Sequence, residues 1–442
     1  MNPRCLMWIW LLSFVWCGGQ AEAVKDRRGA VLSDRAAFEH DARWIYNDWQ
    51  KGFAEAKRTG KPLLVTLRCV PCLACAGLDA RVLMQNVELG PLLDRFVCVR
   101  VMNANALDLS LFQVDYDLSF SAVFFNADGT VYGRYGSWAH QVDSQNAAVD
   151  GFRAALEGVL SLHANYPANR PALAGKQGGD LAFKDPLQIP ALAGKYTRNL
   201  DWEGKVVQSC VHCHQIGDAL RTFHRERKER IPDDLIYPWP APLTVGLELA
   251  PDNARRVRAV QPNSPAGRAG LRVDDEVLTV AGQPIVSEAD VSWTLHRFGD
   301  SGLLPITVKR AGAPWTVRLE LPVGWRTKAD ISRRVGTWDM RAMALGGLLL
   351  EDLPEDQRAA RGLGKDVMAL RVKHAGEYGQ HAAAKRAGFQ KDDVIVELDG
   401  TTARTTESEL IGRLLREHRA GETVAAVILR GTERKPLTLP MQ

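Results

Sequence analysis

The sequence has little net charge and no long apolar run. Its 56 basic and 52 acidic residues leave a formal charge of +4 and are dispersed, so charge alone indicates no nucleic-acid partner. No apolar stretch reaches the ~18 residues of a membrane helix, and the 38 Gly and 22 Pro residues follow no collagen-like period. At about 150 residues per domain, 442 residues with 46% hydrophobic content predict several folded domains and exclude wholesale disorder.

Several catalytic motifs are also absent. The sequence contains no GxSxG elbow, no GxxxxGKS or GxxxxGKT phosphate loop and no HExxH pair. These patterns provide an exposed serine nucleophile, a cradle for phosphates and two zinc-binding histidines. Serine hydrolase, nucleotide-dependent and zinc-protease activities therefore have little support.

Residues 1–23 have the pattern of a secretory signal peptide. An apolar stretch from Cys5 to Trp16 is followed by the small-residue cleavage site Ala21-Glu22-Ala23. An uncleaved membrane anchor is the alternative, but the stretch is shorter than the ~20 residues of a spanning helix. Export places the chain in an oxidising compartment, where cysteine pairs are stable or are used for exchange. The cysteines that remain after cleavage are Cys69, Cys72, Cys75, Cys98, Cys210 and Cys213.

Residues 30–165 predict one α/β domain, because helical and extended patterns alternate there. The expected elements are a helix over 44–59, a strand from Leu63, a helix near Cys72, a strand from Phe96, a hairpin around 126–129 and a helix over 147–162. Residues 166–204 are rich in Pro, Gly and Ala with weak periodicity, which predicts a linker.

The first chemical motif is RCVPCLAC, with Cys69, Cys72 and Cys75 in two overlapping CxxC pairs. Cysteines between a buried strand and a helix N-terminus favour the thiolate, since the helix dipole stabilises negative charge there. A purely structural disulfide and a metal site are the alternatives. Cys98 lies within an apolar strand pattern and is expected to be a buried thiol.

The region around this motif, KPLLVTLRCVPCLACAGLDARVL, resembles the active-site region of exported thioredoxin-like domains. The resemblance implies that Cys72 is the nucleophile and Cys75 the resolving thiol, with Cys69 an additional cysteine able to pair with Cys72. The chain departs from the family where thioredoxins have a cis proline, because Phe120 and Ser121 precede the strand there. In that family the proline takes part in substrate docking, so its replacement argues against ordinary thioredoxin turnover.

The second motif is CVHCH, with Cys210, Cys213 and His214. CxxCH is the attachment sequence of c-type haem, in which the cysteines form thioethers and the histidine binds the iron. A zinc site that adds His224 is the alternative. Residues 205–236 are similar to single-haem segments of bacterial cytochrome c proteins over these few positions, so one covalent haem c is expected.

The second axial ligand of such a haem is not evident. No methionine occurs between Met102 and Met340. Met340, Met343 and His224 are the candidates for the distal position, and an open sixth position is the alternative.

The C-terminal part of the chain contains an internal repeat. Residues 269–282 match residues 387–400 without a gap, which predicts two copies of one domain, at 237–323 and 344–442, joined by a linker over 324–343.

Both copies resemble bacterial PDZ domains. The resemblance implies two loops that offer backbone N–H groups to a peptide carboxylate, with helices near 291–298 and 410–417 as the other walls of the grooves. These loops contain Gly246 with Leu247 and Gly347 with Leu348. Packing domains with degenerate grooves are the alternative.

The order of these units resembles a family of bacterial exported thioredoxin/PDZ proteins, some of which carry selenocysteine. The expected fold class is therefore multidomain α/β plus α+β: a thioredoxin-like domain, a short helical haem c segment and two PDZ-like β-rich domains. The expected function is a periplasmic thiol-disulfide redox protein with covalent haem, whose PDZ domains recruit a protein or peptide partner. The alternatives are a non-catalytic haem c-containing scaffold whose PDZ grooves do the binding, an electron-transfer or sensor protein, and a metal chaperone that uses the three closely spaced thiols.

Overall fold

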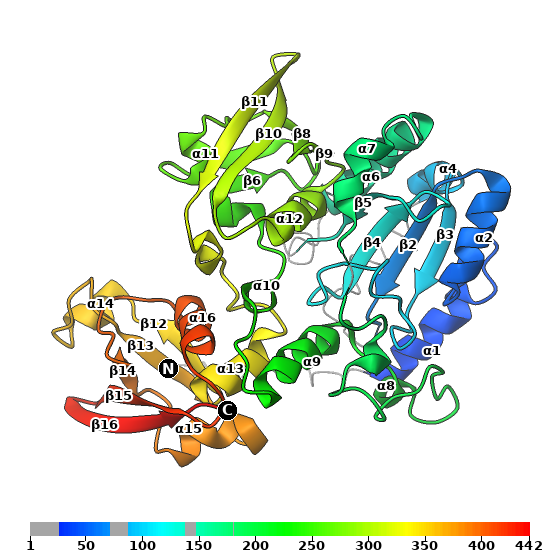
Figure 1. The fold of residues 1–442 in the computed structure, drawn as a ribbon. Coiled ribbons are helices and arrows are strands. Elements are labelled where there is room, and N and C mark those ends of the chain that lie inside the picture. The colour runs from blue at the N-terminus through cyan, green and yellow to red at the C-terminus, as the bar shows by residue number, and fades with distance from the viewer. Residues whose placement is uncertain (1–25, 71–86, 138–146, 180) are drawn as a thin grey trace, which may run out of the picture.

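The computed structural model describes residues 26–70, 87–137, 147–179 and 181–442. Its N-terminal domain is built on a five-stranded sheet of order β1-β3-β2-β4-β5 (Figure 1). β1 and β2 run parallel to β3, whereas β4 is antiparallel to β2 and to β5. The strands are β1 (Trp44–Tyr46), β2 (Leu63–Arg68), β3 (Val97–Val101), β4 (Phe120–Phe125) and β5 (Val131–Tyr135).

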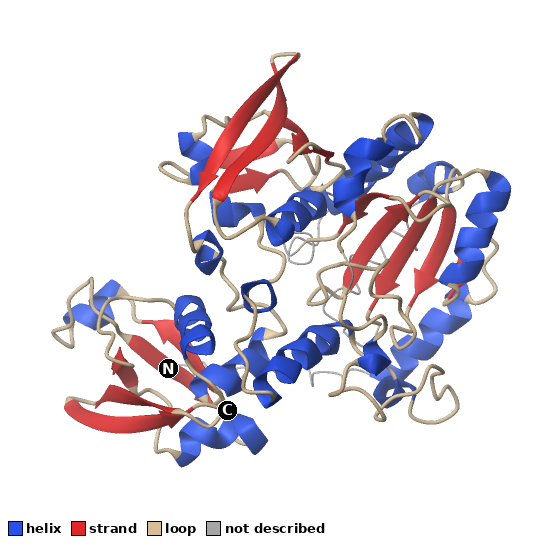
Figure 2. Ribbon diagram, in the orientation of Figure 1, coloured by secondary structure: helices blue, strands red, loops and turns tan. Residues whose placement is uncertain are grey.

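Helices lie on both faces of this sheet (Figure 2). One apolar core contains Leu64, Phe124 and Phe152, and the other contains Leu63, Val65 and Val99. Every residue of β2 and β3 is buried, as expected for strands covered on two sides. The helices of this domain are α1 (Arg27–Phe38), α2 (Trp49–Thr59), η3 (Val87–Leu89), α4 (Gly90–Leu93) and α6 (Ala147–Ala164).

The helix predicted over 44–59 begins later than expected. Trp44–Tyr46 form β1, and the side chain of Asp48 accepts a hydrogen bond from the N–H of Lys51 to cap α2. The aromatic residues of β1 complete the edge of the sheet, so tertiary pairing outweighs the local helical pattern there.

The predicted linker over 166–204 is wrong, because this segment packs against the N-terminal domain. Leu173, Ile189 and Leu192 are buried in the two apolar cores of that domain. The short helices of the segment are α7 (Arg170–Leu173), η4 (Ala174–Lys176) and η5 (Pro186–Gln188). Proline and glycine here set tight turns on a packed surface rather than a free connection.

Residues 205–236, named the bridging segment below, are helical as predicted. They contain α8 (Val206–Ser209), α9 (Cys213–Glu226) and α10 (Asp233–Ile236). Ile216 and Ala219 of α9 join the core of the N-terminal domain. At the other end of α9, Arg225 donates to the carbonyls of Gln442 and His418 at 2.5 and 2.8 Å. The bridging segment thereby joins the N-terminal domain to the C-terminal end of the chain (Figure 1).

The first repeat domain contains η6 (Pro242–Val245), β6 (Leu247–Leu249), β7 (Val257–Val260), α11 (Pro265–Arg268), β8 (Glu276–Val280), β9 (Gln283–Pro284), α12 (Glu288–Arg297), β10 (Gly302–Arg310), β11 (Ala313–Leu321) and η7 (Trp325–Lys328). The order of its larger sheet is β11-β10-β8-β9, and β6 pairs with β7 in a separate two-stranded sheet. Val291 and Leu295 of α12 pack into its core.

The second repeat domain contains α13 (Thr337–Leu345), β12 (Leu348–Asp352), α14 (Glu355–Ala359), β13 (Leu370–Ala375), η8 (Gly379–Ala382), α15 (Ala383–Arg386), β14 (Val394–Leu398), α16 (Glu407–Glu417), β15 (Thr423–Arg430) and β16 (Glu433–Pro440). Its five-stranded sheet has the order β12-β13-β14-β15-β16. The predicted linker over 324–343 is wrong as well, since Trp325 is buried in the core of the first repeat domain and α13 in that of the second.

Each repeat domain contains an ion pair between a buried aspartate and an arginine, at matching positions of the repeat. Asp275 binds Arg310 at 2.7 and 2.6 Å, and Asp393 binds Arg430 at 2.8 and 2.8 Å. The preceding residues, Asp274 and Asp392, both have positive φ, at 67° and 70°. A left-handed backbone is one that glycine adopts without strain and that aspartate visits as a single residue.

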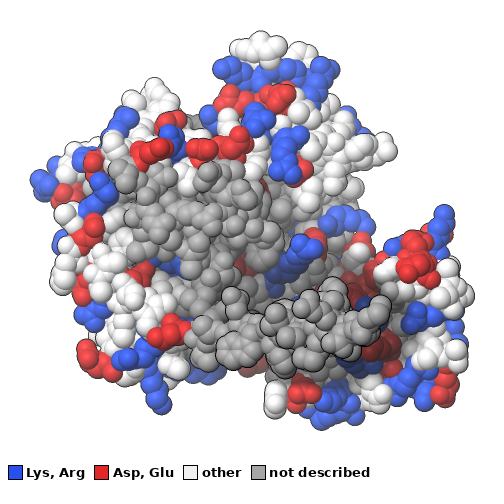
Figure 3. All heavy atoms as spheres, turned by 180° about the vertical axis from the view of Figure 1, so that it is seen from behind, with Lys and Arg blue, Asp and Glu red and all other residues white. Residues whose placement is uncertain are grey.

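The surface carries charges of both signs. Figure 3 shows Lys and Arg side chains interspersed with Asp and Glu over the visible described face. Among the described residues, no helix combines the length and the apolar character needed to cross a membrane.

Candidate functional site

Cys69 lies at the carboxyl end of β2, where the first motif begins. Its N–H donates to the carbonyl of Ser119 at 3.0 Å, on the segment that leads into β4. The buried guanidinium of Arg68 donates to the carbonyl of Cys69 at 2.7 Å. The residue is 6% exposed, so the folded edge of the sheet fixes its position. Cys72 and Cys75 lie outside the described residues.

Asn105 holds the start of the second motif against the N-terminal domain. Its side-chain oxygen accepts from the N–H of Val211 at 2.7 Å, and its amide donates to the carbonyl of Ser209 at 2.7 Å. The same amide donates to the carbonyl of Thr197 at 2.7 Å. Sequence reasoning missed Asn105, because nothing in its local sequence indicates a partner so distant along the chain.

The two cysteines of the second motif are in contact with the N-terminal domain rather than on an open loop. Cys210 is 4% exposed, packs in an apolar cluster with Val31 and Val70, and directs its Sγ to the carbonyl of Met102 at 3.7 Å. Burial raises the pKa of Cys210 to about 12, and the nearby Cys69 adds to the effect.

Cys213 is the first residue of α9 and is partly buried. The helix dipole would favour its thiolate. Burial nevertheless raises the pKa of Cys213 well above its ordinary value, and both Cys69 and Cys210 add to this shift. The thiol is therefore the dominant form near neutral pH. For Cys213, burial outweighs the stabilisation of the thiolate by the helix dipole.

His214 is oriented by a carboxylate one helical turn away. Its Nδ1 lies 3.0 Å from Oδ2 of Asp218, and Oδ1 of Asp218 accepts from the buried Arg221 at 2.5 Å. A histidine held at Nδ1 in this manner has Nε2 directed elsewhere, which is the arrangement of many metal-binding histidines. The i,i+4 spacing of His214 and Asp218 is visible in the sequence and could have indicated this pair.

A cavity of about 140 Å³ brings the two motifs together. Cys69 from the end of β2 and Cys213 with His214 from the start of α9 all contribute to its walls. The other lining residues are Arg27, Tyr116, Asp117, Leu118, Ser119, His212 and Val335. The structure thus combines two motifs that the sequence presents as independent.

This cavity does not accommodate a porphyrin. Pockets for drug-sized ligands measure about 300–1,000 Å³, whereas the cavity beside Cys213 and His214 is less than half the lower value. Cys210 is packed among apolar side chains, which leaves no described space beside its sulfur for a macrocycle. The donor set suits haem c, but the packing does not, and haem attachment stays a prediction from the motif.

The three candidates for a distal iron ligand do not line this cavity. Met340 and Met343 are buried in the apolar core of the second repeat domain, where their flexible side chains fill space. His224 is hydrogen-bonded through Nδ1 to Glu229 at 3.1 Å and lines a different cavity, of about 370 Å³. This differs from the prediction of a distal iron ligand, because both methionines pack in an apolar core away from the cavity.

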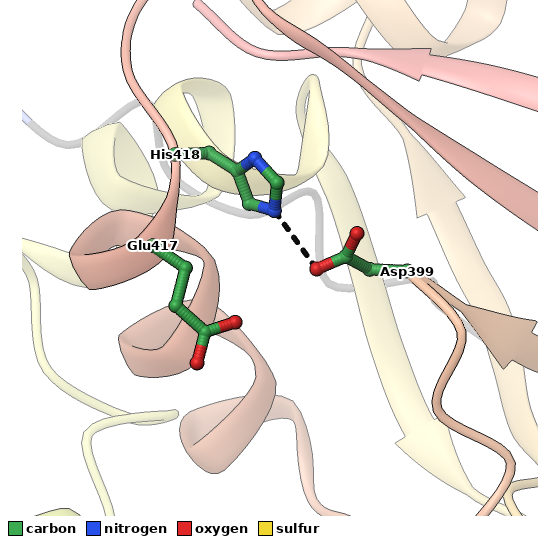
Figure 4. Close-up of side chains that lie close together, drawn as sticks. All are labelled: Asp399, Glu417 and His418. Carbon is green, nitrogen blue, oxygen red and sulfur yellow. Dashed lines mark hydrogen bonds and ion pairs between the residues drawn. The ribbon is translucent and has the colours of Figure 1, made fainter.

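The zinc alternative also lacks its geometry. Within the described part of the chain, the one group of three or more potential ligands within mutual reach is Asp399, Glu417 and His418, not the cysteines of the second motif. Figure 4 shows His418 turned toward Asp399 at the end of α16. Arg413 already lies 3.7 Å from Asp399, so this group forms an ion-pair cluster.

This cluster predicts a pH-dependent stability of the second repeat domain. Burial alone would lower the pKa of His418, but hydrogen bonds to Asp399 at 2.8 Å and to Glu422 at 3.0 Å outweigh it and raise the pKa above 6.5. The stabilisation is therefore complete below pH 6.5 and is lost as the pH rises through the raised value.

We expect the melting temperature to fall as the pH rises above 6.5, and the His418→Gln variant to show a smaller fall. Thermal unfolding of both proteins across this range measures the difference. Arg413 stays charged throughout and contributes equally to both proteins. Equal pH dependence of the two proteins would contradict the assignment.

The glycines of the two predicted peptide loops already have partners. Gly246 has φ of 81° and donates its N–H to the carbonyl of Leu243 at 2.9 Å. Gly347 has φ of 88° and donates to the carbonyl of Arg341 at 2.9 Å. Leu247 and Leu348 are fully buried. This differs from the prediction, because the glycines shape the loops while their N–H groups bond within the chain.

The helix α12 of the first repeat domain is docked on the N-terminal domain. Asp290 of α12 accepts from the N–H of Arg134 on β5 at 3.1 Å and pairs with the buried Lys176 at 2.9 Å. Trp293 donates from its indole to the carbonyl of Gly175 at 2.9 Å. Sequence reasoning missed this interface, because it predicts only a groove wall from this helix.

The corresponding helix α16 of the second repeat domain is held by α13. Glu407 accepts from the guanidinium of Arg341 at 2.9 and 2.6 Å, and from the N–H of Leu350 on β12 at 2.8 Å. α13 thus packs against α16 and against β12, the two elements that border the predicted groove. Both groove helices are therefore engaged within the chain.

Comparisons with known proteins identify two of these units. A family model described as thioredoxin-like matches residues 44–127, and a PDZ domain model matches residues 256–295. The chain therefore contains a thioredoxin-like domain and a PDZ domain, which confirms this part of the prediction. No curated protein matches the chain.

Solved structures of an HtrA-type protease, AlgW, are similar to parts of the chain. A form with a serine-to-alanine substitution and a decapeptide is 17% identical, with a TM-score of 0.22, and the match covers 42% of this chain and 53% of that one. AlgW with a decapeptide is 19% identical, with a TM-score of 0.20 and coverage of 31% and 42%. AlgW with a tripeptide is 17% identical, with a TM-score of 0.21 and coverage of 42% and 58%. The matches thus span about half of those chains.

Proposed function

From a thioredoxin-like domain and a PDZ domain in one chain, we propose an exported thiol-disulfide redox protein that recruits a protein partner through its PDZ domains. The observation that carries the redox part is the position of RCVPCLAC: Cys69 lies directly after the buried strand β2, within the matched thioredoxin-like region. A cysteine pair at the end of such a strand is placed for exchange with disulfides. Cys72 is the proposed nucleophile, and Cys75 or Cys69 resolves the mixed disulfide.

The signal-like residues 1–23 support a location in the periplasm, where disulfides persist. The PDZ fold supports binding of a peptide segment of a partner beside a sheet edge. β6 and β12 are edge strands of their sheets and are the proposed docking edges. Because α13 holds α16 and β12 in the second repeat domain, peptide binding there is proposed to require movement of α13.

The redox proposal is tested with the Cys72→Ser variant of the full chain. We expect exchange with a glutathionylated peptide to fall ~10-fold or more, because the thiolate is the reacting species and serine does not replace it. Release of glutathione, followed over time, measures the rate.

Cys98→Ser is the matched control. Cys98 is buried within β3, and burial raises its pKa to about 12, so its replacement is expected to leave the exchange rate unchanged. An unchanged rate in Cys72→Ser, with the fold intact by circular dichroism, contradicts the redox function and leaves a PDZ scaffold.

A further inference from the structure

The CVHCH motif lies against the other cysteine motif, and neither haem nor zinc accounts for its geometry. Cys69 and Cys213 line one cavity of about 140 Å³. Cys210 does not line it, but it is buried and near enough to Cys69 for that thiol to raise its pKa. A porphyrin is too large for this space, and among the described residues the three sulfurs do not form a group within metal-ligand reach of one another. What remains is three thiols from two segments of the chain at one place.

Hydrogen bonds and core packing hold the two cysteine motifs next to each other. Asn105 binds the backbone on both sides of Cys210 with two hydrogen bonds of 2.7 Å. Ile216 anchors α9 in the core of the thioredoxin-like domain. Ser119 holds the backbone of Cys69 at 3.0 Å. The cavity therefore has a wall from each motif, and both walls are held by the same domain.

The chemistry of a CxxC pair in such a place is disulfide exchange. Cys210 and Cys213 are separated by two residues at the start of a helix, the spacing at which a dithiol closes to a disulfide. In an oxidising compartment such a pair forms a disulfide that persists until a thiolate attacks it. The partner sulfur within the same cavity is that of Cys69.

We infer that Cys210 and Cys213 are an internal redox partner of the RCVPCLAC motif and exchange a disulfide with it through Cys69. This inference rests on the proposed redox function and names the internal exchange partner of that site. When Cys69 is in a disulfide, the thiolate of Cys213 attacks its sulfur, a Cys69–Cys213 bond forms, and the former partner of Cys69 leaves as a thiolate. Cys210 then attacks Cys213 and releases Cys69. Two electrons and two protons pass from the CVHC dithiol to the motif.

Burial also sets the pH dependence of the exchange. It raises the pKa of both Cys210 and Cys213, so their thiolates are the minor form near neutral pH. Because the thiolate is the attacking species, the exchange accelerates as the pH rises.

The test uses the full chain with a Cys210→Ser substitution, expressed with its export signal and with cytochrome c assembly proteins. Without Cys210 the second step cannot occur, so the Cys69–Cys213 bond accumulates. We expect at least ~10-fold more of the Cys69–Cys213 peptide than in the wild type, measured by mass spectrometry after alkylation and non-reducing digestion. Cys98→Ser in the same background controls for random oxidation, and circular dichroism checks the fold.

Two results would overturn the inference. The first is a porphyrin joined to Cys210 and Cys213 in the wild type, visible in its absorbance spectrum and in the peptide mass. The second is a folded Cys210→Ser protein without the Cys69–Cys213 peptide. If this protein still exchanges with the glutathionylated peptide, the proposed function stands and only the internal relay fails. If the Cys69–Cys213 bond accumulates while the wild type does not react with that peptide, the relay stands and the proposed external exchange fails.

Discussion

Replacement of Asp290 by alanine is expected to lower the free energy of unfolding by about 3–5 kcal/mol, because it leaves a buried cation without its partner. The side chains of Lys176 and Asp290 are 0% and 1% exposed, and their charged atoms lie 2.9 Å apart. Asp290 also accepts from the N–H groups of Arg134 and Val286, at 3.1 and 3.0 Å. Burial lowers the pKa of Lys176, and Asp290 is the group that opposes this shift.

Because Asp290 lies at a domain interface, we expect its replacement to separate the two domains as well. Asp290 joins α12 of the first repeat domain to β5 and η4 of the thioredoxin-like domain, so its loss weakens their docking as well as the local fold. Urea unfolding followed by tryptophan fluorescence measures the change, since Trp293 lies at this interface. Domain separation would appear as an earlier transition.

Glu248→Ala is the matched control in the same repeat domain. Glu248 forms an exposed pair with Arg258 at 2.9 Å, with side chains 41% and 58% exposed. Exposed pairs contribute about 0–1 kcal/mol, so this variant is expected to unfold near the wild-type denaturant concentration. A loss for Asp290→Ala as small as that of the control would show that the buried pair does not hold the domains together.

Replacement of Glu407 by alanine is expected to have a similar effect in the second repeat domain, again about 3–5 kcal/mol. The carboxylate of Glu407 is buried and accepts from Arg341 at 2.9 and 2.6 Å and from the N–H of Leu350 at 2.8 Å. Its removal leaves a buried guanidinium without its carboxylate and a strand N–H without its acceptor. The latter alone costs about 1–3 kcal/mol.

The Glu407→Gln variant separates these two contributions. Glutamine keeps an oxygen for the N–H of Leu350 but removes the charge opposite Arg341, so we expect an intermediate loss. Glu417→Ala, on the same helix, is the matched control, because Glu417 is 53% exposed and lies 3.9 Å from Arg413. Chemical unfolding of the three variants gives the ranking. Equal stabilities of Glu407→Ala and Glu417→Ala would exclude a structural role for the buried pair.

Glu407 also bears on peptide binding. In the predicted groove, β12 is the strand that a peptide would join, and the N–H of Leu350 on this strand is bound by Glu407. Arg341 ties the same carboxylate to α13. A peptide that joined β12 in the usual mode would therefore bind to a groove in which Glu407 already connects α16, β12 and α13. The second repeat domain acts as a packed unit in this state.

The sequence predicted the elements whose signals are local. The strand from Leu63, the strand from Phe96, the hairpin and the long helix near 147–162 follow from periodicity and turn residues, and each is present as β2, β3, β4 with β5, and α6. The repeat was visible as a constant offset, and both copies contain an Asp–Arg pair at matching positions. Both segments expected to be linkers are packed instead. Their few apolar residues, such as Ile189 and Trp325, are buried in the cores of adjacent domains, which the local sequence does not show.

The candidate site divides in the same manner. The residue types and spacings of RCVPCLAC and CVHCH, and therefore the presence of two sulfur-containing motifs, were determined by the sequence alone. Only the tertiary structure decided that Cys69 and Cys213 share a cavity, that Asn105 holds the second motif there, and that Met340 and Met343 belong to a core. The physical reason is that spacing along the chain fixes local geometry, whereas contact between distant segments depends on how complete apolar faces pack together.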